Sequence, residues 1–150
     1  MVIESNWMFS DARFLNANDR KAGSLCLYLC NIDALAKKKY PDIKSNKERY
    51  TKFLCDELKK LNIDVYYRIE EKNKLVHLSE IIYEYFRCYF VHEADDRTHL
   101  EYEVQLEIES PGRFRFNGGI LVDRIHEKFI LKADWLINLL DSIIESNLAK

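Results

Sequence analysis

The chain has 150 residues, of which 47% are apolar and 32% charged, and its formal net charge is −2. This length fits one domain, which we expect to span residues 1–150 and to fold without a disulfide or metal staple. The charge balance excludes a protein that coats nucleic acid through a global positive field, and the lack of a long apolar run excludes a membrane span.

Scarce helix breakers favour long helices in the first half of the chain. The spacing of apolar residues by three and four predicts a helix over residues 18–40, which Pro41 ends. Residues 10–17 form either a short helix of their own or the beginning of this one. The apolar residues that carry the pattern are Leu25, Tyr28, Leu29, Ile32, Leu35 and Ala36.

Two more helices are expected before residue 93. Ser45 and Glu48 have the spacing of a capping box, so a helix begins there, and Asn62 ends it. The helical period returns at Leu75, and this third helix carries Arg87 towards its end.

The pattern changes to a two-residue alternation after Thr98. Residues 101–109 alternate glutamate or glutamine with apolar side chains, and Pro111-Gly112 and Gly118-Gly119 mark turns. We therefore expect a β excursion at about 101–132, a small antiparallel meander with its apolar face against the helices. The acidic face of its first strand could receive a basic partner or simply face solvent. Asp134 opens a last helix.

These elements predict a mainly α (α+β) fold, a helical bundle with the β meander inserted before the last helix. The four cysteines contain no CxxC pair, so we interpret them as buried, reduced thiols of a cytoplasmic protein and expect no metal site and no cofactor. His77, His99 and His126 suit surface or capping roles. The basic residues between Lys37 and Lys60 form either a solvated helix surface or a phosphate-binding patch.

Arg87 and His92 are the pair with a specific chemistry. Metal-independent RNA cleavage needs a proton-transfer group near neutral pKa and a fixed positive charge on the phosphorane-like transition state. Histidine suits the first task, and arginine suits the second because its fork matches phosphate oxygens. The five-residue separation is weak evidence by itself, and in a regular α-helix it turns the two side chains about 140° apart. Convergence needs a break after Arg87 or a second chain.

The run LSEIIYEYFRCYFVHE at residues 78–93 resembles the HEPN superfamily of helical domains, whose signature is arginine, four to six residues, then histidine. The run SLCLYLCNIDALA at residues 24–36 also resembles the long early helix of these domains. The resemblance covers residues 18–93 and leaves out the β excursion.

This resemblance implies an up-and-down helical bundle that forms a homodimer, with the motifs of both chains lining one cleft. Many members are metal-independent endoribonucleases of toxin–antitoxin, phage-defence and CRISPR-associated systems, so RNA would be the substrate and an antitoxin or other protein a partner. Arg87 would stabilise the phosphate and His92 would transfer the proton. Glu93 and Asp95 either orient His92 or are the acidic end of a helix.

Two functional hypotheses follow. The first is a ribonuclease that cuts single-stranded RNA at the dimer cleft. The second is a catalytically inactive helical dimer that serves as a binding or partner module, in which Arg87 and His92 tie helices together. Active members of the superfamily often carry a polar residue directly after the arginine, where this chain has Cys88.

Overall fold

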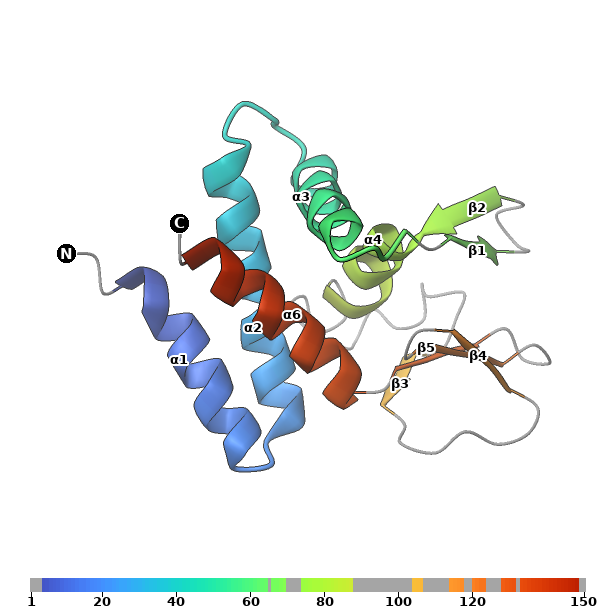
Figure 1. Ribbon diagram of the computed structural model, residues 1–150, viewed down its shortest axis with the longest axis horizontal. Coiled ribbons are helices and arrows are strands. Elements are labelled where there is room, and N and C mark those ends of the chain that lie inside the picture. The colour runs from blue at the N-terminus through green and yellow to red at the C-terminus, as the bar shows by residue number, and fades with distance from the viewer. Residues whose placement is uncertain are drawn as a thin grey trace.

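The computed structural model describes residues 4–64, 66–69, 74–87, 104–106, 114–117, 120–123, 128–131 and 133–148. Most of these residues are helical, which confirms the expected mainly α character. The long helices are α1 (Glu4–Ala17), α2 (Lys21–Lys39), α3 (Asn46–Lys60) and α6 (Ala133–Leu148) (Figure 1).

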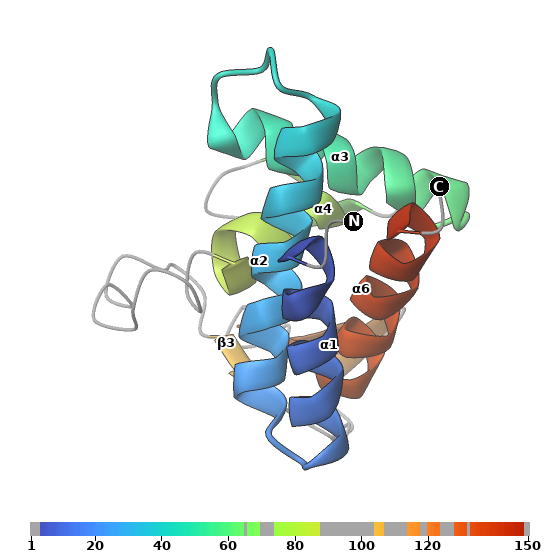
Figure 2. The same ribbon diagram turned by 90° about the vertical axis from the view of Figure 1, so that its left-hand side faces the viewer.

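Helix α2 is the centre of the fold. It packs against α1, α6 and α3, and the first two lie alongside it (Figure 2). Its buried face carries the apolar side chains whose spacing predicted the helix, and side chains of α3 and α6 close over them. Fully buried members of this core include Leu25, Leu29, Ile32, Tyr50, Phe53, Leu54, Leu140 and Ile144.

A chain reversal separates α1 from α2, so residues 10–17 belong to a helix of their own. Asp19 adopts a left-handed conformation, with φ 59°. The Arg20 amide donates to the Leu15 carbonyl at 2.8 Å, and the Asp19 amide donates to the Asn16 carbonyl at 3.1 Å. These two bonds form a Schellman motif, in which aspartate replaces the usual glycine because its short polar side chain tolerates this conformation.

Helix α3 begins and ends where the sequence predicts. The Ser45 hydroxyl accepts a hydrogen bond from the Glu48 amide at 3.2 Å. At the other end Asn62 has φ 60°, and the Ile63 amide donates to the Leu58 carbonyl at 2.9 Å, a second Schellman motif. Both ends of α3 are therefore determined by local sequence.

The third helix begins later than predicted. Residues 74–77 belong to strand β2 (Lys74–His77), which pairs antiparallel with β1 (Tyr66–Ile69). The short helix α4 (Leu78–Ile81) follows and continues as the π-helical turn η1 (Ile82–Arg87). The prediction of helix from Leu75 was wrong because a short apolar run satisfies either period, and the pairing with β1 decides between them.

Four short strands lie within residues 104–131: β3 (Val104–Leu106), β4 (Phe114–Asn117), β5 (Ile120–Asp123) and β6 (Lys128–Leu131). β4, β5 and β6 pair antiparallel in chain order, as a meander does. β3 instead pairs parallel with β6, which makes the strand order β3-β6-β5-β4. The expectation of a purely antiparallel arrangement was wrong for β3, because alternation only favours antiparallel pairing and the neighbour that a strand finds depends on how the fold connects the strands.

Candidate functional site

Arg87 lies at the last residue of η1 and is buried, with 8% of its surface exposed. Its Nε and Nη2 atoms donate to Oδ2 of Asp33 on α2, at 2.9 and 2.6 Å. The Asp33 side chain keeps 28% of its surface exposed, so this ion pair lies at the edge of the core. The pair joins residues 24–36 to residues 78–93, the two runs that resemble the HEPN superfamily.

Two tyrosine rings also lie near the Arg87 guanidinium. Its central carbon lies 5.1 Å from the centre of the Tyr83 ring and 6.0 Å from that of Tyr50. The two rings meet edge to face at 5.1 Å. Attraction between a cation and an aromatic face strengthens when water is excluded, so the rings and Asp33 together hold the positive charge in one place.

η1 is wound as a π-helical turn, which closes hydrogen bonds between residues five apart, whereas an α-helix closes them between residues four apart. π-helical turns occur frequently at functional sites. η1 ends at Arg87, and residues 88–92, which lead from Arg87 to His92, lie outside the described residues. The expected break after Arg87 therefore stays a prediction.

Two cysteines of α2, Cys26 and Cys30, precede Asp33 by seven and three residues. The pKa of the Cys30 thiol is raised to about 11, chiefly by burial and also by neighbouring Cys26 and Asp33, while Arg87 acts in the opposite direction. A thiol with such a pKa is protonated at neutral pH and is a poor nucleophile or metal ligand. Cys30 therefore contributes packing beside Arg87. Cys26, Cys30 and Cys55 are free thiols, as expected, but they are half-buried and not fully buried as predicted.

The other residues predicted for the site, His92, Glu93 and Asp95, lie outside the described residues, as do Cys88, His99 and His126. Of the predicted catalytic pair the structure therefore describes Arg87. Sequence reasoning missed Asp33, its partner, although one signal was available: Asp33 is the only acidic residue between Lys21 and Lys39.

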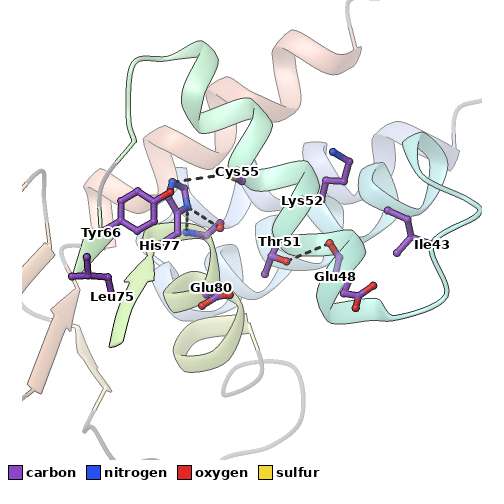
Figure 3. Close-up of a pocket in the computed structure, with 10 residues that line it drawn as sticks. Ile43, Glu48, Thr51, Lys52, Cys55, Tyr66, Leu75, His77 and Glu80 are labelled. Atoms are coloured by element: carbon purple, nitrogen blue, oxygen red, sulfur yellow. Dashed lines mark hydrogen bonds between the residues drawn. The ribbon is translucent and has the colours of Figure 1, made fainter. Parts of the chain in front are cut away.

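A second polar feature is an open hollow of about 520 Å³ between α3, the β1–β2 hairpin and α4, which we call the α3 groove (Figure 3). Glu48 and Cys55 of α3, Tyr66 and Leu75 of the hairpin, and Glu80 of α4 are among its lining residues.

His77 forms part of the wall of the α3 groove and caps α4. Its Nδ1 accepts from the Ser79 amide at 3.1 Å, so this nitrogen carries no proton, and Nε2 donates to Oδ1 of Asp64 at 3.1 Å. The Cys55 sulfur lies 3.9 Å from the same Nε2. Because Nε2 holds the proton, the imidazole is not placed to take one from Cys55, and burial raises the pKa of that thiol. His77 is a buried capping residue, which confirms the capping role and corrects the surface role.

Across the described residues, no three histidine, cysteine, aspartate or glutamate side chains gather in a way that could hold a metal ion. Within the same part of the chain, no helix combines the length and apolar character needed to cross a membrane.

No known protein family, curated protein or solved structure matches this chain.

Proposed function

We propose that the chain is a metal-independent endoribonuclease of HEPN type, which cuts single-stranded RNA at a cleft shared by two copies. The observation that carries the proposal is the placement of Arg87, whose charge is held by Asp33 and two tyrosine rings at the end of a π-helical turn. A charge kept in a fixed position before the substrate arrives stabilises a transition state without the cost of reorganisation.

The chemistry assigns separate tasks to the two motif residues. His92 removes the proton of the RNA 2′-hydroxyl, which then attacks the adjacent phosphorus and expels the 5′-oxygen. His92 of one copy or the other returns the proton to that leaving oxygen. Arg87 stabilises the negative charge on the phosphorane-like transition state. The products are a 2′,3′-cyclic phosphate and a 5′-hydroxyl, and DNA is not cut because it has no 2′-hydroxyl.

One observation favours the second hypothesis, a non-catalytic partner module. Arg87 is buried, and a carboxylate 2.6 Å away already balances its charge. An arginine in such a pair can act as a tie between α2 and η1, in the way that buried ion pairs orient packed helices. Under this hypothesis the chain forms the same helical fold and binds a protein partner, such as an antitoxin, without cutting RNA.

Cleavage assays on the purified chain separate the two functions. A fluorescent single-stranded RNA is incubated with the chain in the presence of EDTA, and the same sequence as DNA serves as the substrate control. The ribonuclease hypothesis predicts RNA cleavage that survives EDTA, no DNA cleavage, and loss of activity by at least about a hundredfold in His92→Ala. Arg20→Ala removes an exposed arginine and is the matched control, with unchanged activity expected.

Thermal unfolding of the same variants makes the assay decisive. If His92→Ala unfolds at the wild-type temperature and has lost cleavage, His92 acts in catalysis. RNA cleavage that persists in His92→Ala rejects the assigned mechanism. No cleavage by the wild-type chain, together with a lower unfolding temperature in Arg87→Ala, supports the partner module. Light scattering of the wild-type chain tests the shared cleft, which a strict monomer would contradict.

A further inference from the structure

The α3 groove has the length of a short peptide segment. Glu48 and Cys55 lie at its two ends on α3 and are seven residues apart. At a rise of 1.5 Å per residue they are separated by about 10 Å along the helix axis. An extended chain covers about 10 Å with three residues, and its side chains at positions i and i+2 point to the same side.

The groove carries negative charge. Glu48 and Glu80 line it, and within the part of the chain that the structure describes neither carboxylate has a basic partner. Lys52 also lines the groove, but its ammonium lies 3.6 Å from Asp56 and 5.1 Å from the Tyr40 ring. Asp56 therefore competes for this lysine, and the two glutamates leave the lining with a net negative charge. A cationic occupant would gain two partners here, whereas RNA phosphates would be repelled.

The hairpin end of the groove is apolar and exposed. Leu75 and Tyr66 are 62% and 50% exposed, so both side chains offer apolar surface to an occupant of the groove. The Tyr66 and His77 rings pack edge to face with their centres 4.9 Å apart, and His77 is itself held by Asp64. This apolar surface is thus supported by buried structure. Figure 3 shows Tyr66, Leu75 and His77 together at one end, with Glu80 and Glu48 farther along the groove.

We propose that the α3 groove binds an extended peptide segment of a partner protein in which lysine or arginine follows a large apolar residue by two or three positions. The apolar side chain packs on Tyr66 and Leu75, and the cation reaches Glu80 or Glu48. This site is separate from the Arg87 site and does not depend on ribonuclease activity, so either proposal can fail without the other.

NMR titration of the full chain tests the site with two defined probes. The first peptide is Ac-Ser-Gly-Leu-Ala-Arg-Gly-Ser-NH2, and the second replaces its arginine with glutamate. We expect saturable amide shifts confined to α3, the hairpin and the start of α4 with the arginine peptide. The glutamate peptide should bind about tenfold more weakly or less, because it places like charges together.

Charge variants of the protein complete the test. The double variant Glu48→Gln/Glu80→Gln should lower the affinity for the arginine peptide about five- to tenfold without changing the unfolding temperature. The matched control, Asp11→Asn/Asp134→Asn, removes two exposed acidic charges from α1 and α6 and should leave the affinity unchanged. The proposal is overturned by the absence of saturable shifts, by equal affinity for both peptides, or by a short RNA oligonucleotide that shifts the same residues.

Discussion

Replacing Asp33 by asparagine tests whether the ion pair with Arg87 holds η1 against α2. The substitution keeps the size of the side chain and removes its charge, which weakens the two hydrogen bonds that Arg87 donates at 2.9 and 2.6 Å. Breaking a buried ion pair costs about 3 to 5 kcal/mol, and the 28% exposure of Asp33 lowers this figure. We expect the free energy of unfolding to fall by about 2 kcal/mol, which corresponds to roughly 4 to 8 °C in Tm for a chain of this size.

A double-mutant cycle in urea isolates the pair. The cycle combines Asp33→Asn with Arg87→Met, which keeps the aliphatic part of the arginine, and we expect a coupling energy of at least about 1 kcal/mol. The exposed pair between Lys21 and Asp134 is the matched control, with side chains 32% and 74% exposed, and its coupling should stay below about 0.5 kcal/mol. Equal, small couplings for the two pairs would refute the stabilising role assigned to Asp33.

The same substitution also bears on function. If Arg87 acts on RNA, Asp33 positions its guanidinium, and Asp33→Asn should lower RNA cleavage at temperatures where the variant is fully folded. If Arg87 only ties helices together, the variant should lose stability, and the wild-type chain should show no cleavage to lose. Activity and unfolding measured on one protein sample therefore distinguish positioning from simple support.

Three further predictions concern stability. The hydrogen bond from Arg13 holds the pKa of Asp141 below its ordinary value, so the carboxylate stabilises the fold at neutral pH. This contribution is lost as the pH falls below the ordinary carboxyl pKa and through the lowered folded-state pKa. The difference in Tm between wild type and Asp141→Asn should therefore shrink on acidification, and a difference independent of pH would contradict this origin. Ser45→Ala removes the cap of α3 and should lower the free energy of unfolding in urea by about 1 kcal/mol. Ser45→Gly should lower it by only about a few tenths of a kcal/mol. Equal losses for the two variants would argue against the cap. Leu54→Ala should lower the free energy of unfolding by about 2 to 5 kcal/mol because Leu54 is fully buried. Leu61→Ala, at a position 44% exposed, should lower it by less than about 1 kcal/mol. Similar losses for the two variants would show that the core is misassigned.

Most helical elements could be predicted from the sequence because their signals are local. The spacing of Leu25, Leu29 and Ile32 indicates the buried face of α2, and Ser45 and Asn62 mark the two ends of α3. Each of these signals depends on residues within one or two helical turns. Arg87 could likewise be selected as a candidate, since its chemistry and its position near the end of a helical run are visible in the chain itself.

Features that depend on distant residues required the tertiary structure. β2 replaces the expected first turn of the third helix because Tyr66–Ile69 pairs with Lys74–His77, and the parallel pairing of β3 with β6 has no signature in either strand. Asp33, which pairs with Arg87, is 54 residues away from it in the chain. Local periodicity thus determines most of the helical segments and their apolar faces, but not the short run that became β2. Which charged side chains pair is decided by packing, because Arg87 and Asp33 interact only where the fold brings their charged atoms to 2.6 Å.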